Sequence, residues 1–470
     1  MTPVPPRRPA PRLLLCLLAL GAFLLGVGEP RLTAQGGGPA WLAPYRETVT
    51  RLTRAATADD FAWQRLAELT DTYGSRLSGS ENYARAAAWA VETMRKDGLE
   101  AHTEEVLVPR WERGFESAEI VDPPRHAIVV AGLGGTVPTP AGGLEADVLV
   151  VETFEELRAR AAEARGRIVL FNAPFVNYTE TVSYRTSGAR AAALYGASAV
   201  LVRSVGPMGL RTVHTGTVNY VPDATAIPAA AISAEDANRI ARLTARGRRV
   251  RIRLVLENQP LPDVPSVNVV GELRGREHPE QVVLLGGHLD SWDAGTGASD
   301  DAVGCIVTWE ALRLMRRLGL QPRRTVRVVL WANEENGLRG GVAYAAAHAA
   351  EAKDHVFALE SDSGVFWPAT LGFSGSNAAR LQVRDIVSLL APLGFGEPII
   401  GGGGADIGPI AQAGNAPTMA YIGDAAKFFP IHHTPADTVD RIAPEDVSRA
   451  AAAIAALSWV IAEMPERFAR

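Results

Sequence analysis

Apolar side chains recur at helical spacing between Ser80 and Asp97. Every third or fourth position falls on one face, as an amphipathic helix requires. Gly98 follows directly and suits the left-handed turn that ends many helices. The pattern therefore predicts a helix from Ser80 to Asp97, with an apolar face that carries Tyr83, Ala87, Val91 and Met94.

A different pattern fills residues 121–260, where short β-branched runs alternate with short helical stretches. Thr153 and Glu156 have the spacing of a capping box at the start of one such helix. His126 and His214 are isolated in the sequence, and we interpret them as surface or core histidines. The pattern predicts an inserted accessory domain. Its strands are expected at Ala127–Val130, Val148–Val151, Arg167–Phe171 and Ala199–Val202.

Regular α/β alternation follows a segment with three prolines, Gln259–Pro265, which we interpret as a linker. Predicted strands then alternate with a helix at Val303–Leu318, so we expect a largely parallel sheet covered on both faces. Ligands bind such sheets beyond the carboxyl ends of the strands. The strands are expected at Gln281–Leu285, Thr325–Leu330 and Val356–Leu359.

The first residues have the pattern of a signal peptide. Three arginines precede an unbroken apolar run, Leu13–Val27, which is shorter than the ~20 residues that a membrane-spanning helix needs. We place cleavage near Ala34, which predicts a secreted or periplasmic protein with no membrane anchor after removal of the signal. Cys16 leaves with the signal, and Cys305 is then interpreted as a small buried apolar residue.

Length and charge narrow the picture. A chain of 470 residues exceeds one ordinary core, which suggests two or three domains. Lys and Arg (47) nearly balance Asp and Glu (52), for a net charge of −5. This balance provides no basic surface that would neutralise a phosphate backbone, so nucleic acid is not expected as a partner.

Candidate chemistry gathers after the strands predicted beyond residue 260. Two histidines, several carboxylates and a spare glutamate supply the nitrogen and oxygen ligands that catalytic zinc sites use. Adjacent carboxylates on an extended chain point in different directions, so one of them can bind metal while the other faces a reacting water. The candidates are His288, Asp290, Asp300, Glu334, Glu335, Asp362, His432 and His433.

These motifs resemble the two-zinc metallopeptidase family of aminopeptidases and carboxypeptidase Q-like enzymes. The stretches that carry the resemblance are His288–Gly304, Asn333–Gly337, Asp362 with its strand, and His433–Thr438. The resemblance implies a zinc-exopeptidase fold, a mostly parallel central sheet flanked by helices, with a protease-associated-like α/β domain at residues 121–260. Residues 1–34 are then the signal peptide, and residues 35–120 and 261–470 form the catalytic domain. A homodimer is also implied.

Carried over position by position, the resemblance implies two Zn²⁺ per chain bridged by Asp300. His288 and Asp362 would bind one ion, and Glu335 and His433 the other. Glu334 would be the general base that acts on a metal-bridging hydroxide. Asp290 would fix the imidazole of the first histidine, and the peptide bond between Asp300 and Asp301 is expected to be cis.

Two features, one histidine and one glycine-rich loop, each allow two interpretations. Several family members have tyrosine where this chain has His432, which either donates a hydrogen bond to the developing oxyanion or is a spacer on the rim of the site. The glycines Gly401–Gly404 with Asp406 form either a substrate loop or a flexible surface loop.

The leading hypothesis is hydrolysis of small peptides or dipeptides with a free amino end. A carboxypeptidase on the same scaffold is the nearest rival, because the sequence does not show whether the pocket receives an ammonium or a carboxylate. An inactive binding protein and a one-zinc acyltransferase of the glutaminyl cyclase type are further alternatives, against which the complete ligand set argues. No HExxH helix and no GxSxG turn occurs, so helical zinc proteases and serine hydrolases lack their usual signals.

Overall fold

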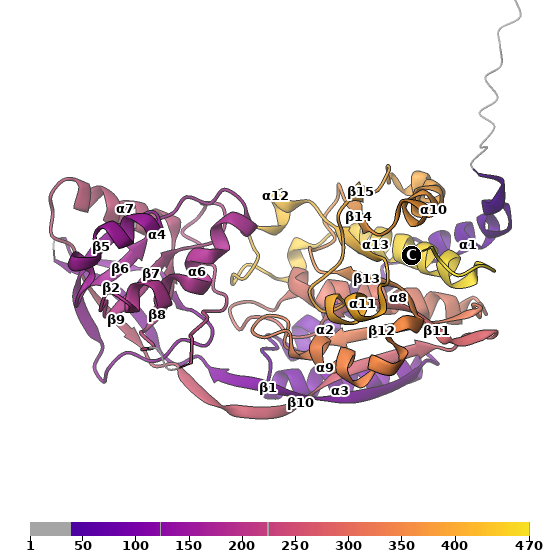
Figure 1. Cartoon of the computed structure of the whole chain (residues 1–470), viewed down its shortest axis with the longest axis horizontal. Coiled ribbons are helices and arrows are strands. Elements are labelled where there is room, and N and C mark those ends of the chain that lie inside the picture. The colour runs from indigo at the N-terminus through magenta and orange to yellow at the C-terminus, as the bar shows by residue number, and fades with distance from the viewer. Residues whose placement is uncertain (1–38, 123, 223–224, 470) are drawn as a thin grey trace, which may run out of the picture. The chain divides into compact units, whose positions relative to one another are not determined.

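The computed structural model describes residues 39–122, 124–222 and 225–469 (Figure 1). The predicted signal peptide, residues 1–34, lies outside the described residues. In the described part of the chain, no helix has both the length and the apolar character needed to cross a membrane.

Among the described residues, one eight-stranded sheet has the order β1-β10-β12-β11-β13-β16-β14-β15. Its four central strands, β12, β11, β13 and β16, run parallel, and β1, β10 and β14 join them in antiparallel fashion. The predicted parallel sheet is therefore confirmed at its centre. The strands are β1 Glu100–Glu112, β10 Gln259–Leu273, β11 His278–His288, β12 Arg324–Trp331, β13 His355–Ser361, β14 Thr370–Ser374, β15 Ile399–Ile400 and β16 Thr418–Ile422.

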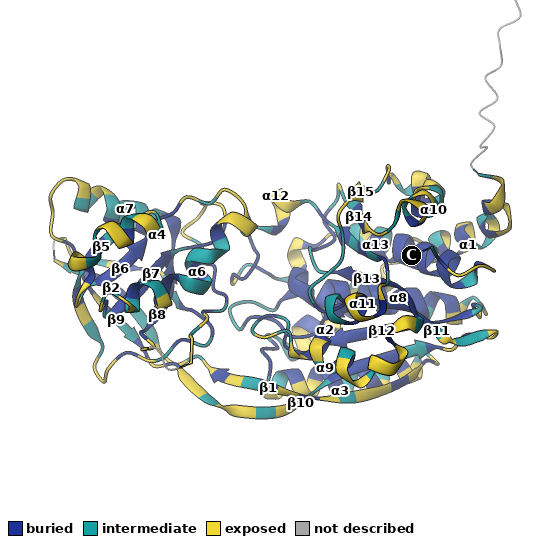
Figure 2. Ribbon diagram, in the orientation of Figure 1, coloured by how far each residue is buried: buried dark blue, intermediate teal, exposed yellow. Residues whose placement is uncertain are grey.

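Helices cover both faces of this sheet, and the strand pleat distributes side chains between them. Val283 and Leu285 of β11 belong to one core with α8 and α13, whereas Val282 and Leu284 belong to another with α9 and α11. Figure 2 shows the central strands buried between partly exposed helices. The helices are α1 Arg46–Ala56, α2 Phe61–Tyr73, α3 Glu81–Lys96, α8 Val303–Arg317, α9 Arg339–Ala347, α10 Asn377–Val387, α11 Gly408–Gly414, α12 Ala425–Phe428 and α13 Pro444–Glu463.

Residues 116–256 build a second sheet, eight-stranded in its described part, with the order β3-β2-β9-β5-β6-β7-β8-β4. Its strands are β2 Glu116–Asp122, β3 His126–Ile128, β4 Val130–Gly132, β5 Leu144–Val151, β6 Ile168–Phe171, β7 Ala199–Arg203, β8 Ala229–Ile232 and β9 Arg251–Leu256. Its helices are α4 Phe154–Ala159, α5 Ala161–Ala164, α6 Tyr178–Ala193 and α7 Ala234–Ala245. The chain enters this sheet after β1 and returns through β10.

The predicted helix from Ser80 to Asp97 is confirmed. The Ser80 hydroxyl caps its first turn by accepting from the Tyr83 amide, and Gly98 follows its end with a φ of 82°. The predicted linker Gln259–Pro265 is wrong, because this segment is the first half of β10 and pairs with β1. Its prolines are tolerated because this half of β10 has β1 on one side only.

Candidate metal centre

The ends of three parallel strands bring the predicted site residues to one edge of the first sheet. His288, the last residue of β11, pairs in register with Trp331, the last residue of β12. β13, on the other side of β11, ends at Ser361, directly before Asp362. The loops that leave these strands therefore start side by side, and the polar residues that follow each strand can meet.

Asp300 lies at the centre of the cluster. Its Oδ1 is 3.2 Å from His288 Nε2, and its Oδ2 is 3.1 Å from His433 Nε2. On the first side, Asp362 Oδ1 is 3.3 Å from His288 Nε2. On the second side, Glu335 Oε2 is 3.0 Å from His433 Nε2. The structure thus brings together all five predicted metal ligands, in two groups that share Asp300.

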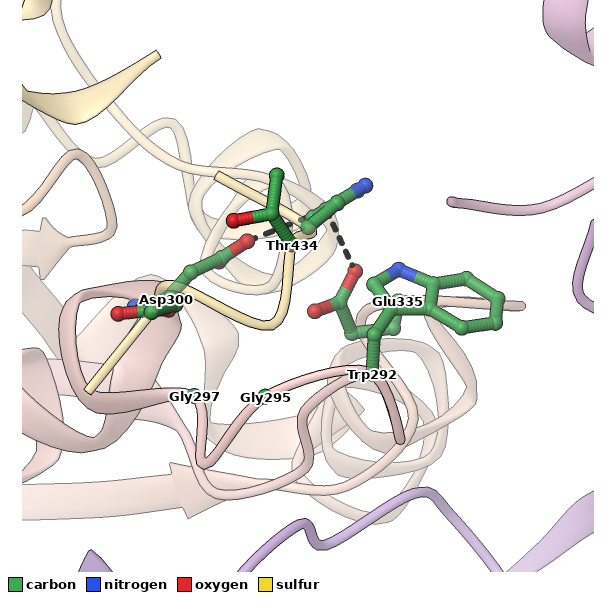
Figure 3. A pocket seen from close by; sticks show the side chains of 8 residues that line it. Trp292, Gly295, Gly297, Asp300, Glu335 and Thr434 are labelled. Atoms are coloured by element: carbon green, nitrogen blue, oxygen red, sulfur yellow. Dashed lines mark hydrogen bonds and ion pairs between the residues drawn. The ribbon is translucent and has the colours of Figure 1, made fainter. Parts of the chain in front are cut away.

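Figure 3 shows the second of these groups from close by. The side chains of Asp300 and Glu335 extend from different segments toward the loop that carries Thr434, and the Trp292 ring lies beside Glu335. A small cavity lies against this group. Three of the residues that line it, Trp292, Gly295 and Gly297, belong to the loop between β11 and α8. The histidine at position 433 follows α12, so this group joins segments that are distant in the sequence.

The donor atoms fit divalent metal ions. His288 Nε2, Asp300 Oδ2 and Glu335 Oε1 are buried and make no hydrogen bond in the protein. Their side chains form one of the described groups whose ligand atoms all lie within 4.8 Å of one another. Imidazole nitrogens and carboxylate oxygens at the end of a sheet are the ligand types of catalytic zinc sites. Because buried carboxylates need positive partners, the cluster suits cations.

Electrostatics reinforce this picture. Burial acts to raise the pKa of Asp300, but the histidines around it hold that pKa well below its ordinary value. Burial lowers the pKa of His433, but Glu335 and Asp300 more than reverse this and raise it well above its ordinary value. Burial raises the pKa of Glu335 to about 7. Carboxylates that face each other in a buried site thus rely on nearby positive charge.

Asp290 contacts the imidazole of His288, as the sequence predicted, but through its backbone carbonyl. His288 Nδ1 contacts the backbone oxygen of Asp290 at 2.8 Å, whereas the nearest carboxylate oxygen, Oδ1, is 3.7 Å away. The carboxylate instead accepts hydrogen bonds from the amides of Glu334 (3.1 Å) and Glu335 (3.4 Å) and from the Ser78 hydroxyl (3.0 Å). The carboxylate thus holds the loop that carries the two glutamates, and the backbone carbonyl of the same residue holds the imidazole.

Two aspartates that the sequence interpretation did not count among the site residues hold the loop around Asp300. Asp437 accepts from the Ser299 amide (2.7 Å), the Ser299 hydroxyl (2.8 Å) and the Asp300 amide (3.2 Å). Asp301 accepts from the amides of His288 and Gly304, both at 3.1 Å. The expected cis peptide bond between Asp300 and Asp301 is present. Asp437 lies in the stretch His433–Thr438 that carried the family resemblance, but no role was assigned to it there.

Arg76 is a further residue for which the sequence held no signal. Its side chain is fully buried and donates to the carbonyl oxygens of Leu289 (2.8 Å), Thr296 (2.7 Å) and Gly297 (3.0 Å). These residues belong to the loop that links β11 to Asp300. An arginine from the segment before α3 therefore shapes the path of that loop.

A pocket of about 500 Å³ opens on the cluster. Glu334 and His432 line it from the first sheet's side. His432 is buried, its ring stacks on that of His433 at a centroid distance of 3.6 Å, and its Nε2 is 3.4 Å from Asp300 Oδ2. It is therefore part of the pocket wall rather than a spacer on the rim. Residues near the second sheet complete the wall, namely Tyr178, Arg185, Thr217 and Asn219.

The glycine-rich loop lies elsewhere. Gly402–Gly404 line a separate, open depression together with residues of α11, and none of the residues from Gly401 to Asp406 lines the pocket at Glu334. Asp406 is buried beside Glu360, which accepts from the Asp406 and Ile407 amides. The geometry favours a structural loop over a substrate loop.

Comparison with known proteins identifies a matching family and several relatives. Residues 268–458 match the model of peptidase family M28. Human carboxypeptidase Q is 44% identical over 414 residues, which cover 88% of each chain. Aminopeptidase YwaD from Bacillus subtilis is 23% identical over 406 residues, which cover 83% of this chain and 82% of that protein.

Solved structures show the same fold. A peptidase M28 precursor from Shewanella amazonensis superposes with a TM-score of 0.87 and 35% identity, covering 91% of this chain and 98% of that one. BSAP, a zinc aminopeptidase from Bacillus subtilis, superposes with a TM-score of 0.66 and 22% identity, covering 87% of this chain and 96% of that one. The fold of this chain is therefore one that solved peptidase structures share.

Proposed function

The chain belongs to peptidase family M28, and on that premise we propose that it is an exopeptidase that hydrolyses small peptides with a free amino end, using two zinc ions per chain. Asp300 would lie between the ions, with His288 and Asp362 on one and Glu335 and His433 on the other. The observation that carries the proposal is that the two carboxylate oxygens of Asp300 face two different histidines, at 3.2 and 3.1 Å.

The chemistry divides between the ions and the protein. Zinc held by these side chains would activate a water molecule and polarise the scissile carbonyl. Glu334 takes a proton from the attacking water and delivers it to the leaving nitrogen. Burial raises the pKa of Glu334 well above its ordinary value, against the opposing effect of His288, which suits a group that must both accept and release a proton. His432 lines the same pocket and is available to donate a hydrogen bond to the developing oxyanion.

The size of the pocket supports a short substrate. Its volume of about 500 Å³, lined by residues from the regions of both sheets, is of a size that suits a short peptide. Human carboxypeptidase Q and the zinc aminopeptidase BSAP bear names that refer to opposite ends of a peptide. Pocket size alone does not choose between them.

Arg185 favours the second candidate, a carboxypeptidase or dipeptidase on the same scaffold. This buried arginine lines the pocket, and it has no carboxylate partner among the described residues. It donates instead to the Tyr178 hydroxyl (2.8 Å) and the Thr215 carbonyl (3.3 Å), and its Nη1 lies 3.2 Å from His433 Nδ1. An arginine free of a carboxylate suits the carboxyl end of a substrate.

One experiment tests both candidates. The metal content of the purified protein is measured by elemental analysis, and cleavage of free, N-acetylated and C-amidated dipeptides is followed with and without a chelator. We expect two zinc ions per chain and chelator-sensitive cleavage that N-acetylation blocks. Blockage by C-amidation as well would identify a dipeptidase, and cleavage of the N-acetylated substrate would identify a carboxypeptidase. A protein without metal and without cleavage of any peptide would refute the proposal.

We also propose that the protein acts outside the cytoplasm, as a secreted or periplasmic enzyme. The support is the apolar run Leu13–Val27 after three arginines. Expression of the full chain in a bacterium, followed by N-terminal sequencing of the exported protein, tests this. A mature N-terminus near residue 35 is expected, and an intact N-terminus in a cytoplasmic product would contradict it.

A further inference from the structure

The loop between β7 and β8 of the second sheet is hydrogen-bonded to the segment that carries His433. His214 Nδ1 is 2.8 Å from the backbone oxygen of His432. The amide of Thr215 donates to the backbone oxygen of His433 at 3.0 Å. In the opposite direction, His433 Nδ1 lies 3.3 Å from the carbonyl oxygen of Thr215. Three contacts thus join two consecutive residues of one loop to two consecutive residues of the other.

These contacts fix a backbone that needs support. His433 has a φ of 60°, in the left-handed region that side chains other than glycine rarely adopt. Because a Cβ crowds the backbone in this conformation, hydrogen bonds to the adjoining carbonyls help to hold it. The bond to the His433 oxygen and the bond to the His432 oxygen both come from residues 214 and 215.

His433 Nδ1 lies between two groups that line this loop, the Thr215 carbonyl oxygen at 3.3 Å and Arg185 Nη1 at 3.2 Å. When Nδ1–H donates to this carbonyl, Nε2 keeps its lone pair and directs it at Asp300 and Glu335. Arg185 Nη1 donates to the same carbonyl at 3.3 Å and reinforces its orientation. The carbonyl is itself held in place because the Thr215 hydroxyl donates to Gly132 O at 2.9 Å.

The buried position of His214 indicates that the contact of its Nδ1 has a structural role. Its side chain is buried, its Nε2 has no hydrogen-bond partner, and its ring lies so close to Gly206 that a Cβ there would be 2.2 Å from Cε1. An apolar side chain would fill this space without leaving a nitrogen unpaired. The sequence interpretation of His214 as an ordinary core histidine accounts for its burial and not for its contact with residue 432.

His288, the histidine of the other proposed metal position, is held by its own loop. His288 Nδ1 contacts the Asp290 carbonyl, which belongs to its own loop at the end of β11. The two histidines are thus held by different parts of the chain. A change at residue 214 should therefore affect the two metal positions unequally.

We propose that His214 and Thr215 are positioning residues for the metal position formed by Glu335 and His433, so that this position is complete only when the loop of the second sheet is docked on residues 432 and 433. The inference rests on the proposed function, because it presumes that two ions bind. It gives the second sheet a part in assembling the metal centre, in addition to lining the pocket.

The test compares three substitutions of His214 in the full chain. His214→Asn keeps an N–H near the position of Nδ1, His214→Gln moves the amide to the position of Nε2, and His214→Leu removes the donor. His126→Leu is the control, because His126 lies in the same sheet and contacts Asp236 rather than the site. Zinc affinity is measured by competition with a chromophoric chelator, and the visible spectrum is followed during cobalt(II) titration.

For His214→Leu and His214→Gln we expect one ion bound as tightly as in the unaltered protein and the second bound about 10–100-fold more weakly, with loss of one cobalt band. His214→Asn should bind both ions within about threefold of the unaltered protein, and His126→Leu should not differ from it. Because Asn and Gln differ by one methylene, the comparison remains informative even if the leucine variant does not fold.

Three outcomes would overturn the inference. These are wild-type affinity for both ions in the glutamine and leucine variants, equal weakening of both ions, or weakening in the asparagine variant as large as in the glutamine variant. The unaltered protein is measured in parallel. If it binds fewer than two ions, the proposed function fails instead, so the two failures are distinguishable.

Discussion

At the scale of single residues, the two adjacent glutamates after β12 have separate environments. Both line the pocket, and Glu335 Oε2 is in addition 3.0 Å from His433 Nε2, inside the metal cluster. The Asp290 carboxylate holds both backbone amides, so the two side chains are directed apart from one fixed segment. This arrangement suits the proposed roles, in which Glu335 binds metal and Glu334 transfers protons.

The first prediction follows from this separation. Glu334→Gln keeps the size of the side chain but cannot accept a proton, so we expect kcat to fall by about 10²–10⁴-fold. Metal content and KM should stay close to those of the unaltered protein. Steady-state kinetics and elemental analysis measure these quantities. Glu335→Gln is the matched control, and it should lose metal as well as rate; full activity of Glu334→Gln would rule out the assignment.

The sequence predicts those site residues that follow strands, and it does so because position and chemistry coincide there. His288, Glu334 and Asp362 each follow or end a strand whose β-branched pattern is recognisable. Arg76 and His214 carry no such pattern, because their roles depend on contacts across 213 and 218 residues of sequence. Only the folded chain brings them to the site.

At the scale of elements, local rules succeed where the stabilising contacts are local. The helix α3 has its cap at Ser80 and its terminating glycine in the sequence itself, so its bounds are predictable. β10 is different, because the three prolines of Gln259–Pro265 indicate a linker, and only pairing with β1 makes this segment a strand. The sequence does not show that partner, since β1 precedes β10 by more than a hundred residues.

The attachment of α9 to the sheet leads to a prediction about pH. His355, at the start of β13, contacts the Tyr344 hydroxyl of α9 at 2.9 Å and the Glu351 carbonyl at 3.2 Å. Arg327 donates to the same tyrosine hydroxyl at 2.7 Å, which leaves the hydroxyl proton for the histidine. Burial lowers the pKa of His355 to about 4, with a smaller lowering from Arg327 and His348.

Since the folded pKa lies below the ordinary value of 6.5, the unfolded chain binds the proton more tightly. This contribution to stability is present above pH 6.5 and is lost as the pH falls toward 4. It amounts to about 2 kcal/mol between pH 7 and pH 5. Chemical denaturation at both pH values should show that His355→Gln loses about that much less stability than the unaltered protein. Equal losses in the two proteins would refute the role of His355.

At the scale of the whole molecule, the candidate metal centre joins distant parts of the chain. Its side chains come from the loops after β11, β12 and β13 and from the segment after α12. Asp437 and Arg76 hold the first of these loops, and Thr215 connects the last of them to the second sheet. Metal ions that bind there would link these segments in the folded state only.

Removal of metal should therefore destabilise the entire molecule. A ligand that binds only the folded state stabilises it by about 4 kcal/mol when its free concentration is a thousand times Kd. Two ions under such conditions would raise Tm by roughly 8 °C in a chain of this size. We expect a shift of that order between zinc-loaded and chelator-treated protein in thermal denaturation.

Asp300→Ala provides the control for this last prediction. Because Asp300 faces both histidines, its removal weakens both positions, and chelation should then change Tm by only a few degrees. The alanine variant alone should resemble the chelated unaltered protein, apart from relief of the repulsion between buried carboxylates. A large and equal shift in both proteins would mean that the chelator removes metal from somewhere else, and the absence of any shift in the unaltered protein would mean that this cluster holds no structural ion.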